Sequence, residues 1–436
     1  MKALTFASLL LLFTASAHAD NWGQFRGPHF NGSAHEKNLP TNWSTTKNIA
    51  WSADLPGPSA ATPCVWNNRI FISSTDSASD SLKAMCFNRK NGQLLWEHVI
   101  ATGTSQDTRS NFSAPSPATD GELVVFFYGN GDLAAFDFAG KKLWSRNIQK
   151  DYGSFAFQWT FSTSPLLFDG KLYLQVLQRD VAVRDRGLKD RKNESYLLAM
   201  NPKTGKTLWR HIRPSKANAE SLEAFSTPMP YKHNGRTEIV VVGGDDLTGH
   251  DPETGDELWR WGTWNPDRIG HWRLVPSAVA GDGVILACAP KKDPIYAVKA
   301  GGKGQLDDSA LLWTSKKERA VTSDVPTPAF YDGDFFVLSD VTKTLSRVEP
   351  KSGKVKWSVK TTGGSKYEAS PLAADGKIYL VNFDGEVVIV NAADGEQINV
   401  IPMVEERTKD VVRSAIVASD GQLFIRTNRK LYCVGQ

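Results

Sequence analysis

Residues that could carry out catalysis or bind a metal are scattered along this chain. Its four cysteines, Cys64, Cys86, Cys288 and Cys433, form no C-x-x-C pair, and the seven histidines beyond residue 19 form no cluster. No H-E-x-x-H, G-x-S-x-G or phosphate-binding P-loop pattern occurs. The sequence therefore does not support a zinc site of the usual ligand spacing, a hydrolase of these classes or a P-loop nucleotidase.

The cysteines are interpreted as structural residues. Cys86 and Cys433 occupy corresponding positions of a repeat, described below, in which other copies have Ala or Gly. We therefore expect small buried side chains, with one disulfide among the four cysteines as the alternative.

A hydroxyl residue recurs eight times, in most copies directly before a proline. The eight residues are Thr62, Ser116, Ser164, Thr227, Ser277, Thr327, Ser370 and Ser414. If each precedes the innermost strand of a repeated unit, the hydroxyls form a ring near the mouth of a central channel. We expect them to satisfy backbone groups where the strands begin, and contact with a ligand is the alternative.

Long connections between the units carry aromatic and charged residues. Arginine and aromatic side chains on loops are favoured in partner recognition, although the same aromatic side chains could pack the loops onto the fold. The candidate binding residues are Arg109, Trp159, Arg268, His271, Trp272, Arg273, Asp324, Glu368 and Arg413. A further connection, residues 178–195, mixes both charge signs; we expect a solvated loop, with docking of an acidic partner as the alternative.

The elements that position these residues are predicted by eight Asx-led turns, each followed by an apolar run. Asp and Asn tolerate the positive φ angles of tight hairpin turns, and apolar runs without polar alternation indicate strands covered on both faces. The turns are at Asn67-Asn68, Asp120-Gly121, Asp169-Gly170, Asn234-Gly235, Asp282-Gly283, Asp332-Gly333, Asp375-Gly376 and Asp420-Gly421.

A second turn and a tryptophan close most units. Residues 198–209 run Leu-Ala-Met-Asn-Pro-Lys-Thr-Gly-Lys-Thr-Leu-Trp, and the pattern returns before Trp259. Each unit thus contains four antiparallel strands, which is the blade of a β-propeller. The eighth unit ends without its Trp strand, and residues 48–52, Asn-Ile-Ala-Trp-Ser, precede the first unit. We predict an all-β, eight-bladed propeller over residues 48–436 whose last blade is closed by the N-terminal strand.

Composition and the N-terminus limit the protein class. The 436 residues are 41% hydrophobic with a net charge of +4, which argues against disorder and against a nucleic-acid footprint. Residues 1–19 have the charged, apolar and small-residue regions of a signal peptide, with cleavage expected after Ala19 and no Cys there for lipid attachment. We expect a periplasmic or secreted monomer without a transmembrane segment. Residues 20–47 would be a strap that packs on the ring or stays mobile.

The repeat Ala-x-Asn/Asp-x-x-Thr-Gly-x-x-x-Trp at residues 199–209, with a variant at 249–259, resembles the tryptophan-docking repeat of pyrroloquinoline-quinone (PQQ)-like propellers. The nearest types are BamB-like envelope assembly proteins and secreted PQQ-like proteins, whose N-terminus is similar to Trp-Gly-Gln-Phe-Arg-Gly-Pro at residues 22–28. That fold serves scaffolds, binding proteins and dehydrogenases.

The resemblance implies two functions. One is an extracytoplasmic binding or scaffolding propeller that engages an envelope protein or peptide through its loop face, without a cofactor. The alternative is a quinoprotein dehydrogenase that holds PQQ with calcium and oxidises an alcohol or sugar. The sequence departs from the dehydrogenase pattern because it has no adjacent-cysteine pair, no C-x-x-C-H haem site and no recognisable calcium set. The prediction therefore favours binding over catalysis.

Overall fold

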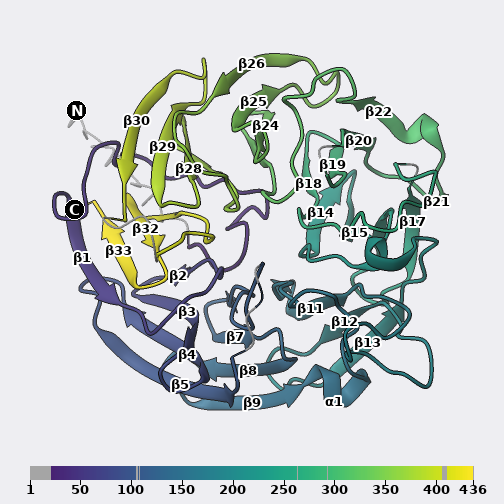
Figure 1. The fold of residues 1–436 in the computed structure, drawn as a ribbon, viewed down its shortest axis with the longest axis horizontal. Helices are drawn as coiled ribbons and strands as arrows, with labels where there is room; N and C mark the ends of the chain where they lie inside the picture. Colours follow the sequence, from purple (N-terminus) through teal and green to yellow (C-terminus); the bar gives the residue numbers. More distant parts are fainter. Residues whose placement is uncertain are drawn as a thin grey trace, which may run out of the picture.

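A computed structural model describes residues 21–104, 107, 109–262, 264–291, 293–404 and 410–435. They form eight sheets arranged in a ring, each built on four antiparallel strands, which confirms the predicted propeller (Figure 1). The predicted signal peptide lies outside the described residues. Within the described ranges, no helix has the length and apolar character needed to cross a membrane.

Each blade contains four antiparallel strands, given below in order from the strand nearest the channel outward. Blade 1 contains β2 (Cys64–Trp66), β3 (Arg69–Asp76), β4 (Ser81–Asn88) and β5 (Leu94–Thr102), and blade 2 contains β6 (Ala118–Thr119), β7 (Leu123–Phe127), β8 (Asp132–Asp137) and β9 (Lys142–Asn147). Blade 3 contains β10 (Leu166–Phe168), β11 (Lys171–Val176), β12 (Tyr196–Met200) and β13 (Thr207–Ile212), and blade 4 contains β14 (Met229–His233), β15 (Arg236–Gly243), β16 (Asp246–His250) and β17 (Glu257–Trp261). Blade 5 contains β18 (Val279–Gly281), β19 (Val284–Cys288), β20 (Ile295–Lys299) and β22 (Leu311–Thr314), and blade 6 contains β23 (Ala329–Tyr331), β24 (Asp334–Ser339), β25 (Thr344–Val348) and β26 (Val355–Lys360). Blade 7 contains β27 (Leu372–Ala374), β28 (Lys377–Val381), β29 (Glu386–Asn391) and β30 (Gln397–Pro402), and blade 8 contains β31 (Val417–Ser419), β32 (Gln422–Arg426), β33 (Lys430–Val434) and β1 (Ile49–Asp54).

Some short helices, turns and strands are not among the four strands of any blade. They are α1 (Ile148–Tyr152), two 3-10 turns, η1 (Ala219–Leu222) and η2 (Asp308–Ala310), and β21 (Gly304–Gln305), which pairs in parallel with β17.

The first hairpin of each blade depends on left-handed backbone at its turn. In six of the eight predicted turns both residues have positive φ; Asp375 at +52° and Gly376 at +69° are an example. The strands that follow are buried on both faces, as in β7, where all five residues are buried. The fourth strands β5 and β26 alternate between exposed and half-buried residues because successive side chains of a strand point to opposite faces of the sheet.

Six tryptophans on fourth strands join one blade to the next. Each indole packs on the glycine of the turn before the last strand of the following blade, and its Nε1–H donates a hydrogen bond to a nearby backbone carbonyl. The pairs are Trp51 with Gly92, Trp96 with Gly140, Trp144 with Gly205, Trp209 with Gly255, Trp313 with Gly353 and Trp357 with Gly395.

Trp259 does not follow this pattern. Its indole lies over Gly249 of its own blade and donates to the buried carboxylate of Glu238 at 2.9 Å. Where the repeat has Ala199, this blade has Gly249, and a Cβ there would lie 2.1 Å from the indole nitrogen. The missing methyl group makes room for the indole.

The ring closes as predicted. Strand β1 pairs with β33 so that Trp51 lies opposite Cys433, and the N-terminal strand thereby completes the last blade. The predicted burial of the cysteines is also confirmed, because all four are buried free thiols.

Residues 21–47 pack against the ring at the end where the first hairpins turn. The side-chain amide of Gln24 forms two hydrogen bonds with the backbone of Leu167 in blade 3, at 2.9 and 3.0 Å. The buried guanidinium of Arg26 reaches the opposite side of the ring, where it donates to the carbonyls of Pro328 at 2.7 Å and Pro371 at 3.2 Å. The strap therefore runs across one end of the channel, near the centre of the ring (Figure 1).

Candidate functional site

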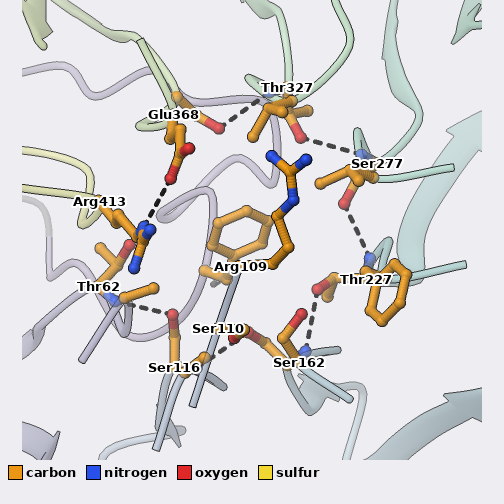
Figure 2. Close-up of a pocket in the computed structure, with 18 of the residues that line it drawn as sticks. Thr62, Arg109, Ser110, Ser116, Ser162, Thr227, Ser277, Thr327, Glu368 and Arg413 are labelled. Atoms are coloured by element: carbon orange, nitrogen blue, oxygen red, sulfur yellow. Dashed lines mark hydrogen bonds and ion pairs between the residues drawn. The ribbon is translucent and has the colours of Figure 1, made fainter. Parts of the chain in front are cut away.

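The eight recurring hydroxyl residues lie where the innermost strands begin, at the end of the channel opposite the strap. Six consecutive links of this ring are hydrogen bonds in which the backbone N–H of one residue donates to the hydroxyl of the next blade's residue, at 2.8–3.2 Å, from Thr62 round to Ser370 (Figure 2). The structural role expected for the hydroxyls is therefore present. Each accepting hydroxyl keeps its own proton, which it can donate into the channel.

A cavity of about 180 Å³ occupies this end of the channel. Seven of the eight ring residues line its wall, and the aromatic ring of Phe25, from the strap, also lines it. Because Gln24 and Arg26 on either side of Phe25 are buried and bonded to opposite blades, the strap forms the floor of this cavity. We call this space the cup.

The rim of the cup gathers five of the nine candidate residues: Arg109, Trp159, Arg273, Glu368 and Arg413. In Figure 2, Arg109 extends across the middle of the hydroxyl ring, and Arg413 meets Glu368 at its edge. The residues come from connections after blades 1, 2, 4, 6 and 7, which the closed ring brings to one face.

On one side of the rim the charges are paired. Glu368 accepts a hydrogen bond from Nε of Arg413 at 2.6 Å and a second from Lys366. Lys366 and Arg413 also lie against the ring of Phe383, with the charged groups 4.5 and 5.0 Å from its centroid. Glu368 is the one carboxylate among the described residues that line the cup, and both cations beside it offset its charge.

On the other side Trp159 is held in place by its neighbours. Its Nε1–H donates to Glu220 at 3.1 Å, and the guanidinium carbons of Arg109 and Arg184 lie 5.7 and 5.1 Å from its ring. Glu220 also forms an ion pair with Arg273 at 3.5 Å. By contrast, the guanidinium of Arg109 has no carboxylate partner in the described part of the chain, which leaves a cation at the centre of the rim.

Arg184 comes from the connection at 178–195, which was expected to be a solvated loop. Most of its charged residues are exposed. The guanidinium of Arg184 nevertheless lies against the ring of Trp159 at the rim. At the start of this connection, Arg179 pairs with the fully buried Glu223, and the backbone N–H of Gln158 donates to the same carboxylate at 3.0 Å. Burial raises the pKa of Glu223 to about 7 against the opposing effect of Arg179.

The other four candidate residues do not line the cup. Asp324 accepts a backbone hydrogen bond from Lys291 at 2.7 Å, and Arg268 pairs with the buried Asp245 at 3.5 Å. His271 is exposed, and Trp272 is half-buried against the core of blades 3 to 5. They lie on loops outside the cavity, so partner binding by these four residues stays a prediction.

Several residues of the cup were not among the candidates. Among them are Phe25, Ser110, Thr160, Ser162, Phe225 and Val275. Phe25 lies within the Trp-Gly-Gln-Phe-Arg-Gly-Pro segment, which was singled out only as a family resemblance. The position of the strap across the channel has no local sequence signal.

The lining of the cup does not fit calcium with a quinone. Calcium requires six to eight oxygen ligands, mostly carboxylates and carbonyls. Glu368 is already paired with two cations, and three arginines surround the space. Over the described ranges, no three His, Cys, Asp or Glu side chains converge in a way that could hold a metal ion.

Comparison with models of protein families shows the family to which this chain belongs. The model of the family described as outer membrane protein assembly factor BamB matches residues 34–186, 159–304 and 243–436. The chain belongs to this BamB family. Among curated proteins, no relative matches the sequence.

Solved structures share the fold of this BamB-family chain at low identity. The crystal structure of BamB from Moraxella catarrhalis is 13% identical over 88% of this chain and 96% of that one, with a TM-score of 0.56. The quinohemoprotein alcohol dehydrogenase from Comamonas testosteroni is 14% identical over 96% and 81%, with a TM-score of 0.61. A europium-containing methanol dehydrogenase is 10% identical over 96% and 98%, with a TM-score of 0.67. At such identities these similarities show the fold alone, which scaffolds and dehydrogenases share.

Proposed function

We propose that this chain is an extracytoplasmic binding propeller that engages a carboxylate-bearing segment of a protein partner in the cell envelope through the cup and its rim. The observation that carries the proposal is the convergence of Arg109, Arg273 and Arg413 on one cavity that also exposes Trp159. Arginine and tryptophan are the residue types that contribute most to binding in protein interfaces.

The electrostatics of the rim favour an anionic partner. Glu368 and Glu220 are each bonded to cations of the same rim, so a partner carboxylate would meet a net positive surface. An unpaired guanidinium can form two parallel hydrogen bonds with a carboxylate, and Arg109 is available for this geometry.

Site-specific photo-crosslinking in cells of the native host tests the proposal. A photoreactive residue placed at Ser110 on the rim is expected to crosslink a defined envelope protein, and the crosslink should disappear when Arg109 and Arg413 are both replaced by Ala. The matched control places the same residue at Thr204, in a turn at the strap end of the ring. Identical products from both positions would contradict the proposal.

The alternative is a quinoprotein dehydrogenase. It predicts that the purified chain binds PQQ in the presence of calcium with measurable heat and then oxidises an alcohol or a sugar. Because Lys366 and Arg413 offset the charge of Glu368 in the cup, we expect no calcium-dependent heat at high micromolar quinone. A calcium-dependent binding isotherm together with substrate oxidation would reverse this conclusion.

A further inference from the structure

The cup is closed at one end, and this limits what can enter it. Phe25 forms the floor, and the strap beneath is anchored on opposite sides of the ring by Gln24 and Arg26. A polypeptide cannot pass through the channel while the strap is in place. A chain that enters the cup must therefore end in it, turn back within it or reach it with a single side chain.

The size of the cup fits a small part of a chain. Its volume of about 180 Å³ is close to the ~150 Å³ of an apolar cavity that holds one benzene molecule. One terminal residue fits such a space, whereas a turn of chain, which requires two passes of backbone, does not.

The chemistry of the lining is dominated by hydrogen-bond donors. Six ring hydroxyls accept a backbone N–H and keep a proton to donate. Above them the guanidinium of Arg109 adds five N–H donors, none of which has an acceptor side chain among the described residues. A carboxylate only accepts hydrogen bonds, which suits this surface. A carboxamide of the same shape would direct two N–H donors at it.

Apolar surface lies directly beside these donors. Phe25, Trp159, Phe225 and Val275 share the lining with the hydroxyl ring. The last residue of a polypeptide carries a carboxylate and a side chain on the same Cα, and this pairing of an acceptor with an apolar group matches the cup.

We propose that the cup binds the free C-terminal carboxylate and terminal side chain of a partner polypeptide. This inference rests on the proposed function, since it specifies which part of the partner enters the site. It excludes two other sources of the same carboxylate chemistry, an internal Asp or Glu side chain and a freely diffusing acid.

Peptide pools with the purified chain test the inference. The probes are acetylated Gly-Ser-Gly-x-x peptides, with every amino acid at the last two positions, prepared as free acids and as C-terminal amides. A third pool, acetylated Gly-x-Asp-x-Gly with an amidated end, presents an internal carboxylate. The chain is immobilised, and bound peptides are quantified by mass spectrometry. We expect free-acid peptides with apolar last residues to be retained at least tenfold over their amides.

Two double variants show whether the cup is responsible. Replacing Arg109 and Arg413 by Ala should reduce retention of the free acids to the level of the amides. Replacing Lys317 and Arg319, exposed residues outside the cup, by Ala removes the same charge and should leave retention unchanged. Circular dichroism and the melting temperature of each variant report whether it is folded.

Three results would overturn the inference: equal retention of acids and amides, preference for the internal Asp pool, or no effect of the Arg109 and Arg413 variant. Competition by acetate as effective as by the free-acid peptides would also overturn it, because a small acid would then suffice. If any of these occurs while Ser110 still crosslinks an envelope protein, the proposed function stands and the inference fails. If free acids bind but Ser110 crosslinks no protein, the proposed function fails instead.

Discussion

The indole of Trp51 and the backbone carbonyl of Arg89 join the two ends of the ring. The Nε1–H of Trp51 on β1 donates to this carbonyl at 2.7 Å, and its six-membered ring lies against Gly92 in blade 1. Trp51 is 8% exposed. The N-terminal strand therefore both completes blade 8 and ties that blade to blade 1.

Replacing Trp51 with Ala should lower the free energy of unfolding by about 3–5 kcal/mol, because it removes a buried aromatic side chain at the closure of the ring. Urea denaturation followed by tryptophan fluorescence and circular dichroism measures the change. The control is Leu208→Ala, since Leu208 is 48% exposed and its loss should cost less than about 0.5 kcal/mol. Equal stability of the two variants would contradict the closing role of Trp51.

Gln24→Ala should destabilise the attachment of the strap. The substitution leaves the buried N–H and C=O of Leu167 without their partners, at a cost of about 1–3 kcal/mol for each group. Limited proteolysis should then cleave within residues 21–47 faster than in the unmodified chain. Gln93→Ala, in an exposed turn, is the control and should leave the cleavage rate unchanged.

Ser277→Ala should destabilise the hydroxyl ring by about 1–3 kcal/mol, because the buried N–H of Thr227 loses its acceptor at 2.8 Å. Ser277→Thr keeps the hydroxyl, and other ring positions already carry Thr, so this variant should retain most of the stability. Hydrogen exchange of the Thr227 amide gives a local measurement. Unchanged exchange in Ser277→Ala would show that the bond does not protect this amide.

Glu223 should make stability decrease as pH rises. Its pKa in the folded protein is about 7, above its ordinary value of 4.5, so between these values the folded state binds more protons than the unfolded state. The contribution of Glu223 to the free energy of unfolding is fully present below pH 4.5. As pH rises through 7, the free energy of unfolding falls by about 3 kcal/mol because this contribution is lost. Arg179 and Glu220 are the charged groups that act on it.

Glu223→Gln should therefore reduce the difference between unfolding free energies measured at pH 5 and pH 8. Chemical denaturation at the two pH values gives both quantities. The same pH dependence in the variant and the parent chain would assign the effect to other groups.

The four thiols should be unreactive in the folded chain. Burial raises the pKa of Cys86 and of Cys433 to about 12 and that of Cys64 and Cys288 well above the ordinary value. A maleimide reagent at pH 7 should label no cysteine in the native protein and four in guanidinium chloride. Fewer than four labelled residues after denaturation without reductant would indicate a disulfide.

The hairpins and the blades were predictable because their signals are local. Asp375 and Gly376 adopt the left-handed backbone that a tight hairpin requires, and only a few residue types reach it without strain. The closure of the ring was also predictable, since the last unit lacked a strand and residues 48–52 supplied an unattached one.

The cup was predictable only in part. Arg109 and Arg268 are both arginines on long connections, yet Arg109 lines the cup and Arg268 pairs with Asp245 outside it. The direction of such a loop depends on packing between segments far apart in the chain, as in the contact between Gln24 and Leu167. The residues next to Gln24 and Leu167 in the sequence do not indicate that these two residues are in contact.

By itself the sequence determined the number of blades, their strands and the way the ring closes, because turn conformation and strand burial follow from residues close together in the chain. Only the tertiary structure decided that the strap crosses the channel, that Phe25 forms its floor and that three arginines share its rim. These features depend on the closed ring, which brings residues from the N-terminal segment and from five separate connections to the two ends of one channel.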